Sequence, residues 1–197
     1  MAHMRAVLQK LKDAGLTAKP VKCKVAHAQV SFLGHTVGGG IIQPMTEKIE
    51  AVSNFPRPIT KKQVRAFLGL TGYYRKFVPH YATIATPLVE LTKKSAPNTV
   101  KWNEACENAF CILKEKLISP PILMAPDFSQ RFVVQADASS FGLGAVLSQV
   151  DHHGVEHPVA FLSRKLLLRE QRYSVPEKEC LAIVWAIQKQ IGRASCR

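Results

Sequence analysis

Asp137 is the residue of this chain whose position most directly suggests chemistry. It closes an apolar run at 132–134, and small residues and a second predicted strand at Gly144–Gln149 follow it. An ionised carboxylate on a strand that packs a core is costly unless it is paired or binds a metal. Asp-Ala-Ser-Ser is also favourable turn chemistry, so Asp137 can instead simply begin a turn. This stretch alone leaves both interpretations open.

A second carboxylate, Glu179, lies near the start of a helix that is predicted to begin at Ser174. Ser174-x-x-Glu177 is a capping box. The run Cys180–Ile187 is apolar on all sides, which predicts a buried helix. Glu179 either interacts with the dipole at the helix start or lies inside the fold, beside the strand that carries Asp137. The second alternative predicts a pair of carboxylates.

A third candidate site is a row of basic residues and glycines on a helix that Thr60 caps and that ends before Pro79. Successive members of the row are four, four, three and four residues apart, which places them on one helical stripe. Glycine inside a helix costs about 1 kcal/mol relative to alanine. Two glycines on a basic stripe therefore suggest a surface approached closely by a phosphate backbone, although a solvated face broken at the glycines fits as well. The stripe consists of Lys61, Arg65, Gly69, Gly72 and Lys76.

The charge of the chain is strongly basic and unevenly distributed. The formal net charge is +13, and residues 1–100 contain 15 Lys/Arg and 4 Asp/Glu against 12 and 10 in residues 101–197. A basic first half suits a polyanionic partner, of which nucleic acid is the commonest, although charge that only promotes solubility is the alternative. Any metal chemistry is expected in the second half, where most of the acidic residues lie.

The composition indicates a globular protein. Its 197 residues are enough for one or two domains, and 47% of them are hydrophobic. No run approaches the roughly 18 apolar residues of a membrane span, and no leader opens the chain, so an intracellular, soluble protein is expected. The five cysteines form no Cys-x-x-Cys pair, which predicts reduced thiols.

The predicted elements change type along the chain. A helix at Ala6–Ala14 precedes a hairpin of strands at 30–33 and 41–42, which turns at Gly38–Gly40. Besides the helix capped by Thr60, three helical segments are predicted after this hairpin. They are Glu47–Asn54, Ala82–Lys94 and Asn103–Leu117. Pro120-Pro121 marks the clearest boundary, because helical periodicity stops and strand periodicity starts there. A third strand is expected at Pro158–Leu162.

Two other motifs invite a functional interpretation that their context does not favour. The run Gly38–Gly40 lacks the Lys-Ser/Thr of a phosphate loop and lies between strands, so a hairpin turn is predicted. The cluster of Asp151, His152, His153 and His157 has neither metal-ligand spacing nor a rigid scaffold, and a polar hairpin loop is predicted.

Taken together, several stretches resemble the polyprotein of a gypsy-type LTR retrotransposon. They occur in the order of that family and extend from residue 4 to about residue 189. The stretches are MRAVLQKLKDAGLTAKPVKC, SFLGHTV, TEKIEAVSNFPRPITKKQVRAFLGLTGYYRKFVPHYATIATPL, VKWNEACENAF, ADASSFGLGAVLSQ and YSVPEKECLAIVWA.

The resemblance implies an α+β fold, in which a small β-hairpin and a helical thumb/connection precede a truncated ribonuclease H-like mixed sheet with one helix. The implied divisions are the end of the reverse transcriptase palm at 1–45, the thumb/connection at 46–119, a partial ribonuclease H-like domain at 120–190 and a non-native tail at 191–197. The tail, IGRASCR, resembles the translation of a sequencing adaptor.

The resemblance also implies a function. Members of the family are RNA-directed DNA polymerases with a ribonuclease H that cleaves RNA–DNA hybrids, and they act with the rest of their polyprotein. Asp137 matches the family's strand Asp and Glu179 its helix Glu, which are metal-binding catalytic residues at a site for two Mg²⁺ ions in the intact domain. Hard oxygen ligands suit Mg²⁺, and two ions can stabilise both the attacking water and the leaving oxygen.

The chain departs from the family in ways that limit this expectation. It contains no Tyr-x-Asp-Asp motif and no Asp-Asp pair, so it is not expected to polymerise DNA alone. The later acidic ligands of the nuclease are also missing, so weak magnesium binding and negligible cleavage are expected. The alternatives are a non-catalytic basic module that binds nucleic acid and a structural protein with no nucleic-acid role.

Overall fold

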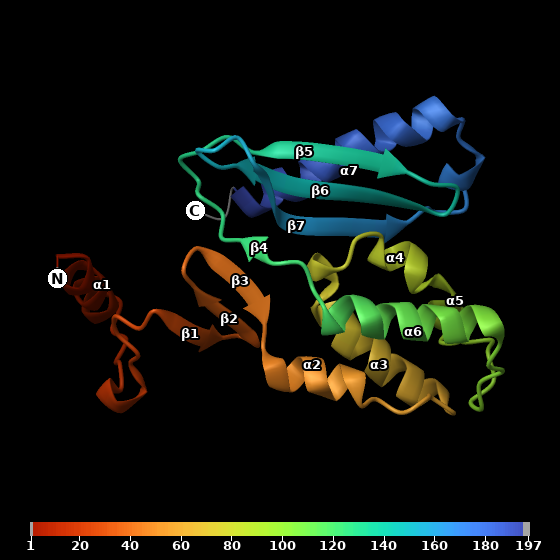
Figure 1. The fold of residues 1–197 in the computed structure, drawn as a ribbon, viewed down its shortest axis with the longest axis horizontal. Helices are drawn as coiled ribbons and strands as arrows, with labels where there is room; N and C mark the ends of the chain where they lie inside the picture. The colour runs from red at the N-terminus through yellow and green to blue at the C-terminus, as the bar shows by residue number, and fades with distance from the viewer. Residues whose placement is uncertain (1, 195–197) are drawn as a thin grey trace.

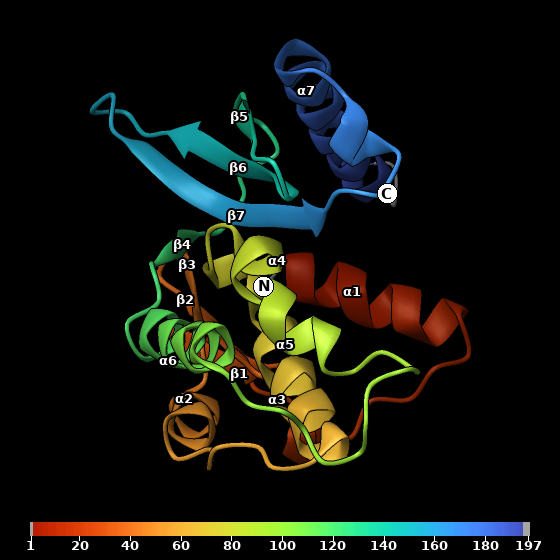
Figure 2. The ribbon, with the colours of Figure 1, turned by 90° about the vertical axis from the view of Figure 1, so that its right-hand side faces the viewer.

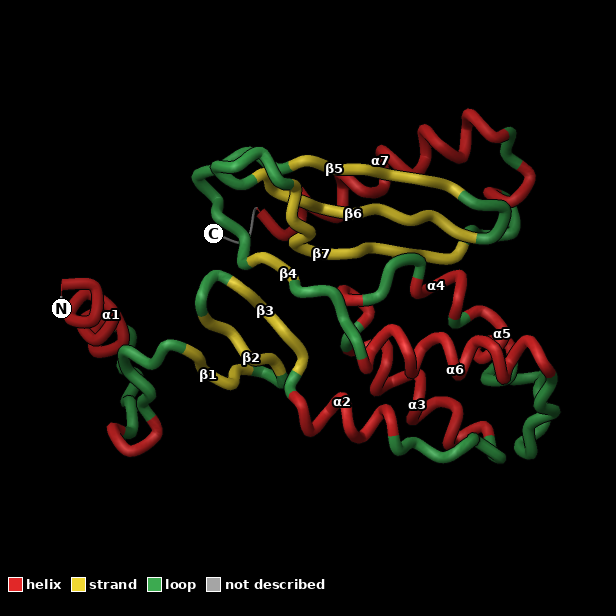
Figure 3. The backbone as a smooth tube through the Cα atoms, viewed as in Figure 1, coloured by secondary structure: helices red, strands yellow, loops and turns green. Residues whose placement is uncertain are grey.

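The computed structural model describes residues 2–194, with side chains for residues 3–189 (Figure 1). Residues 195–197, the end of the tail interpreted as non-native, lie outside the described residues. The chain forms a small N-terminal sheet, a helical unit, and a second sheet with a long helix (Figure 3). The helical unit is defined here as residues 46–118, which contain α2 to α6.

The first sheet is antiparallel, with the strand order β1-β2-β3-β4. It is preceded by α1 (Ala2–Asp13), which stands away from the rest of the molecule (Figure 1), and by a 3-10 turn, η1 (Pro20–Lys22). Its strands are β1 (Gln29–Phe32), β2 (His35–Gly38), β3 (Ile41–Pro44) and β4 (Leu123–Met124).

The predicted turn at Gly38–Gly40 is confirmed, but it joins β2 to β3, and the strand predicted at 30–33 pairs with β2 rather than with the strand predicted at 41–42. Gly39 and Gly40 connect β2 to β3 with φ angles of +59° and +75°, a conformation that glycine adopts at little cost. A second tight turn at Leu33-Gly34 creates β2, because both residues have positive φ. Pattern reasoning missed this turn, since leucine rarely adopts that conformation.

The helical unit contains the main hydrophobic core. Thr60 forms the predicted capping box with Gln63 at the start of α3, and Val64 and Phe67 of that helix are fully buried. They pack with Leu113 and with other buried residues of α5 and α6. The elements of the unit are α2 (Thr46–Ser53), α3 (Lys61–Tyr73), η2 (Arg75–Phe77), α4 (Tyr81–Ile84), α5 (Thr86–Glu90) and α6 (Glu104–Ile118).

Two predicted helices of this unit are shorter than expected. The helix from Thr60 ends at Tyr73, where the N–H of Tyr74 bonds to the carbonyl of Thr71 and begins a tighter 3-10 turn. The predicted helix 82–94 is divided into α4 and α5. Pro87 explains this division, because it lacks an N–H and occupies the first turn of α5.

The second sheet has the strand order β5-β6-β7. Its strands β5 (Val133–Ala138), β6 (Gly142–Val150) and β7 (Glu156–Lys165) are joined by short connections and pair antiparallel throughout. The prediction of a mixed sheet is therefore wrong for the described strands, since short hairpin connections impose antiparallel pairing. A short turn, η3 (Glu170–Arg172), then leads into α7 (Val175–Ala194).

The second sheet lies between α7 on one face and the helical unit on the other (Figure 2). Ala182 of α7 packs with Leu143 and Leu166. The prediction that Cys180–Ile187 is buried on all sides is wrong. The sheet and Leu166 cover one face of α7, whereas Ile183 and its neighbours on the outer face are about half exposed.

Polar contacts fix the helical unit against β7. The N–H of Ala82 donates to the hydroxyl of Ser163 at 2.9 Å, and Lys165 forms an ion pair with Glu90 at 2.7 Å. Because these contacts involve α4 and α5, the sheet is held over that end of the helical unit. None of the described helices combines the length and the apolar character that crossing a membrane requires.

Candidate functional site

Asp137 lies on β5, an edge strand of the second sheet as far as the structure describes it. Its neighbours Ala136 and Ala138 pack against the cluster that contains Ala182 of α7. Because side chains alternate along a strand, the carboxylate of Asp137 lies on the opposite face from α7. The side chain is exposed.

The pairing across the sheet supports this orientation. Asp137 lies opposite Gly144, which lies opposite Ser163. A Cβ atom on Gly144 would lie 2.9 Å from Nδ1 of His80, at the start of α4. The helical unit therefore approaches the face that carries Asp137, and it comes so close that β6 needs a residue without a side chain.

Glu179 lies on α7 and is also exposed. It precedes Ala182 by three residues and so lies one turn away, near the side of the helix that packs on the sheet. Since α7 packs against β5, the elements that carry Asp137 and Glu179 are neighbours. The carboxylate of Asp137 lies on one side of β5 and that of Glu179 on the other, the side of α7. An ion bound by both would therefore have to lie at the free edge of β5.

Neither carboxylate has another partner within the described part of the chain, where the side chains of Asp137 and Glu179 form no hydrogen bond or ion pair. The described residues also contain no group of three or more histidine, cysteine or acidic side chains able to hold a metal ion. Mg²⁺ is commonly bound by one or two carboxylates, with water and substrate phosphates as its other ligands. The two side chains suit a partial magnesium site.

The predicted basic stripe is divided by the structure. Lys61 is only 9% exposed, and its ammonium donates to the carbonyls of Lys93, at 2.8 Å, and Ala96. Arg65 is exposed, although its guanidinium donates to the carbonyl of Thr92 at 3.0 Å. The first half of the stripe therefore holds the loop after α5.

The second half of the stripe is more open. A Cβ atom on Gly69 would meet nothing within 4 Å, whereas one on Gly72 would lie 3.4 Å from the hydroxyl of Tyr81. Lys76 lies on η2 rather than on α3, with its ammonium 5.1 Å from the ring centroid of Phe77. The surface around Gly69 is thus accessible to a ligand.

A pocket of about 400 Å³ adjoins Gly69. It is lined by Gly34, Lys48, Leu70, Tyr73 and Tyr74 as well. Lys48 and Tyr73 were missed by pattern reasoning, because only folding brings the turn before β2 next to the end of α3. The sequence offered one signal for this pocket, the aromatic residue Tyr73 directly after Gly72 of the basic stripe.

His35 anchors that turn to the helical unit. Its ring stacks on Phe77 with a centroid distance of 5.7 Å, and its Nδ1 bonds to the carbonyl of Leu33 at 2.7 Å. Burial lowers the pKa of His35, and its Nε2 is buried without a hydrogen-bond partner in the described structure. The hydroxyl of Tyr74 donates to the carbonyl of Gly34 at 2.8 Å and completes the anchor.

The polar cluster that follows β6 forms the predicted hairpin loop. The carboxylate of Asp151 accepts hydrogen bonds from the N–H groups of His153 and Val155, and it contacts Nε2 of His157 at 2.8 Å. These bonds lower the pKa of Asp151, with the His157 contact as the largest cause. The carboxylate thus organises its own turn.

Comparisons with known proteins agree with this architecture. Residues 102–191 match the family described as an RNase H-like domain found in reverse transcriptase. The chain is 46% identical over 183 residues to the retrovirus-related Pol polyprotein from transposon 297 of Drosophila melanogaster, covering 93% of the chain and 17% of that polyprotein. It is 37% identical over 186 residues to the transposon Tf2-3 polyprotein of Schizosaccharomyces pombe, covering 94% and 14%. The chain thus spans about a sixth of the length of these relatives.

Solved structures show the same fold. A foamy viral protease-reverse transcriptase in complex with RNA/DNA hybrid superposes with a TM-score of 0.79 at 24% identity, covering 96% of this chain and 26% of that one. The same protein in complex with dsDNA gives a TM-score of 0.79 over 98% of this chain and 40% of that one. The polyprotein relatives and the fold agree: over more than nine tenths of its length this chain is similar to a segment of the Pol polyproteins of transposons, and its residues 102–191 match the RNase H-like domain found in reverse transcriptase.

Proposed function

We propose that this segment binds an RNA–DNA hybrid or related duplex and carries the first part of a magnesium-dependent ribonuclease H site. The observation that carries the nuclease half is the state of Asp137 and Glu179. They lie on two elements packed against each other, both are exposed, and neither is paired within the described residues. A buried carboxylate needs a partner, as Glu170 has in Arg164, whereas the exposed carboxylates of Asp137 and Glu179 are open to an ion from solvent.

Asp137 and Glu179 would hold the metal at the edge of β5. Mg²⁺, when bound, would supply positive charge at the attacking water and at the leaving oxygen of the phosphodiester. A cation at that edge would be attracted by the negative charge of both carboxylates, and hard oxygen ligands suit Mg²⁺. The described residues contribute no third ligand, so magnesium binding is weak and cleavage by the segment alone is negligible.

The nucleic-acid half of the proposal uses the exposed part of the basic stripe. Arg65 and Gly69 are exposed, and Gly72 and Lys76 are partly exposed. The proposal places a phosphate backbone across these residues, closest to the helix at Gly69, while Lys61 supports the adjacent loop. The foamy viral relatives of this fold were solved with RNA/DNA hybrid and with dsDNA, which supports the same class of ligand here.

The division of the chain is part of the same proposal. The palm ends at residue 45, the helical thumb/connection at 119 and the partial ribonuclease H-like domain at 190. The ends of β3 at Pro44 and of α6 at Ile118 support the first two boundaries, whereas the match to the RNase H-like family begins earlier, at residue 102, and includes α6.

A second candidate function is a non-catalytic module that binds nucleic acid. The absence of a three-ligand metal cluster from the described residues favours it. In this case the basic surface is functional, whereas the carboxylates at β5 and α7 have no role in catalysis.

Magnesium titration and hybrid binding distinguish these functions. A labelled RNA–DNA hybrid should bind with log K falling by about 0.7–0.9 per phosphate contact as log salt rises. Arg65→Ala should reduce that slope, and a flat profile for the unmodified chain would exclude nucleic-acid binding. Magnesium should shift NMR signals near residues 137 and 179, and Asp137→Asn or Glu179→Gln should abolish the shift, whereas Glu50→Gln on exposed α2 should not.

Cleavage provides the remaining distinction. The proposal expects little release of labelled RNA fragments at any magnesium concentration. Rapid magnesium-dependent release that Asp137→Asn abolishes would mean that the segment holds a complete nuclease site. No magnesium response in the unmodified chain would leave only the binding module.

A further inference from the structure

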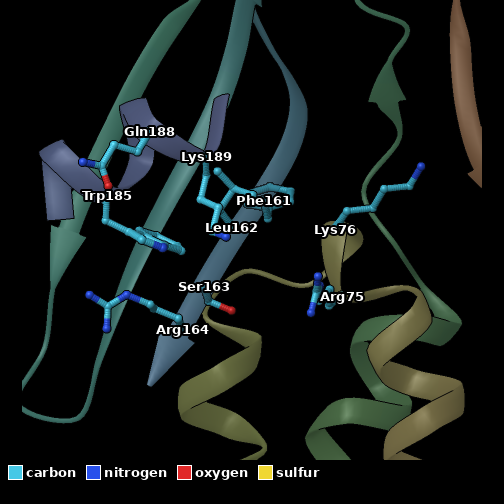
Figure 4. Close-up of a pocket in the computed structure, with 9 residues that line it drawn as sticks. All are labelled: Arg75, Lys76, Phe161, Leu162, Ser163, Arg164, Trp185, Gln188 and Lys189. Atoms are coloured by element: carbon cyan, nitrogen blue, oxygen red, sulfur yellow. The ribbon is translucent and has the colours of Figure 1, made fainter. Parts of the chain in front are cut away.

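A second, larger pocket lies where η2 meets β7 and α7 (Figure 4). Its volume is about 590 Å³, within the usual range for ligand pockets. It lies at β7, two strands away from the edge that carries Asp137, so it is distinct from the proposed metal site. Its lining residues are Arg75, Lys76, Phe161, Leu162, Ser163, Arg164, Trp185, Gln188 and Lys189.

The pocket is basic, and no acidic residue is among those that line it. Arg164 is balanced by Glu170, whose carboxylate accepts two hydrogen bonds from the guanidinium. Arg75 and Lys189 are exposed and have no ion-pair partner within the part of the chain that the structure describes. The positive charge of these two side chains is therefore available to a ligand.

The two available cations come from different parts of the fold. Arg75 belongs to η2 of the helical unit, and Lys189 belongs to α7, the helix that packs on the second sheet. Figure 4 shows Arg75 facing β7 from one side of the pocket and Trp185 facing it from the other. An anionic ligand that contacts both cations must bridge the junction between the helical unit and the sheet.

An aromatic surface accompanies the charge. Trp185 is partly exposed and lines the pocket, with Cζ of Arg164 5.7 Å from the centroid of its ring. Sites for single-stranded nucleic acid combine cations along the backbone with aromatic side chains on which bases stack. A paired base in a duplex cannot stack on an indole inside a pocket without being unstacked first.

We propose that this pocket binds a nucleic-acid strand in its single-stranded form, with Arg75 and Lys189 contacting its phosphates and Trp185 stacking on a base. The proposal rests on the nucleic-acid binding proposed above and adds a second contact region, which shares Lys76 with the basic stripe. A strand held here crosses from the helical unit to the sheet.

The test uses the full chain and a labelled single-stranded oligonucleotide of about 10 nucleotides, a length typical of such sites. Arg75→Gln/Lys189→Gln should reduce the slope of log K against log salt by about 1.4, or about 0.7 for each phosphate that is no longer neutralised. The matched control, Lys101→Gln/Arg131→Gln, removes the same charge from exposed residues outside the pocket and should leave the slope unchanged. Equal reductions of the slope in both double variants would overturn the proposal.

Tryptophan fluorescence tests the stacking contact. Binding should change the emission of the unmodified chain, and Trp185→Ala should remove that change while weakening the complex about 5- to 100-fold. The other tryptophan, Trp102, remains as an internal reference, and circular dichroism checks that the variant is folded. Unaltered affinity in a folded Trp185→Ala variant would contradict the stacking role.

Two further measurements distinguish a failure of this inference from a failure of the proposed function. Inorganic phosphate or a nucleoside monophosphate that binds as tightly as the oligonucleotide would show a site for a small phosphate compound and would overturn the strand proposal. Hybrid binding that depends on Arg65, together with no effect of Arg75→Gln/Lys189→Gln on single-strand binding, would overturn only this inference. Absence of binding to hybrid and single strand alike would overturn the proposed function with it.

Discussion

Arg164 of β7 and Glu170 of η3 form a two-point ion pair, with Nη1 2.7 Å from Oε2 and Nη2 3.1 Å from Oε1. The Glu170 side chain is only 8% exposed, and its Oε2 also accepts the N–H of Leu167 at 2.8 Å. The pair fixes the short segment between the last strand of the sheet and α7. It therefore helps to set where α7, and Glu179 with it, lies relative to β5.

Loss of this pair should destabilise the chain in a pH-dependent way. Glu170→Gln is expected to cost about 1.5–3 kcal/mol at pH 7, because a charge-assisted hydrogen bond is removed from a largely buried site. Hydrogen bonds from Arg164 lower the pKa of Glu170 below its unfolded value of about 4.3. The stabilisation is therefore present above that value and is lost as the pH falls through the lower, folded-state pKa.

Urea unfolding at several pH values measures this contribution. The difference in free energy of unfolding between the unmodified chain and Glu170→Gln should shrink as the pH falls below about 4.3. Glu115→Gln, on the exposed side of α6, is the control and should cost less than about 0.5 kcal/mol. A constant difference across the acid range would contradict the assignment.

Protonation of His35 should weaken the connection between the first sheet and the helical unit. Burial lowers its pKa below the unfolded value of 6.5, so the unfolded chain takes up the proton first. The contribution of neutral His35 to the free energy of unfolding is therefore fully present above about pH 6.5, and it declines as the pH falls toward the folded-state pKa. His35→Phe, which retains ring packing against Phe77, should flatten this decline in urea titrations. His27→Phe, at an exposed histidine, should preserve it.

Lys61 should prove to be a structural residue, because its ammonium satisfies two backbone carbonyls. Lys61→Met keeps the aliphatic stem but removes the donors, and it is expected to cost about 1–3 kcal/mol in urea unfolding. Lys62→Met, at the exposed neighbouring position, should change stability by less than about 0.5 kcal/mol. A lower salt slope for hybrid binding in Lys61→Met, with stability unchanged, would instead favour the phosphate contact predicted from sequence.

Local signals in the sequence predicted the elements that local chemistry controls. Thr60 begins α3 and Asn103 begins α6, because each side chain accepts a backbone N–H of the first helical turn. The strand pairing around Asp137 followed from apolar runs separated by turn residues, and β6 and β7 contain the predicted strands 144–149 and 158–162.

The remaining features depend on contacts between distant residues, which periodicity does not report. β4 returns to pair with β3 after the whole helical unit has intervened. Lys61 fell on a predicted surface stripe, but the loop at 91–96 folds over it. The outer face of α7 is as apolar as the face that packs on the sheet, so the pattern could not distinguish a helix covered on every side from one covered on a single side.

Gly69→Ala should separate stability from binding on α3. The position is exposed, lies inside a helix and has open space where a Cβ would be, so alanine is expected to stabilise the chain by about 0.5–1 kcal/mol. The same methyl group would stand between the helix and a phosphate backbone that approaches it, and hybrid affinity should therefore fall. Urea unfolding and fluorescence anisotropy measure the two effects on one preparation. The control, Ala66→Gly, lies on the same helix but off the stripe, and it should lower stability by a similar amount and leave hybrid affinity unchanged. If Gly69→Ala is stabilised but binds the hybrid as tightly as the unmodified chain, the nucleic acid binds elsewhere.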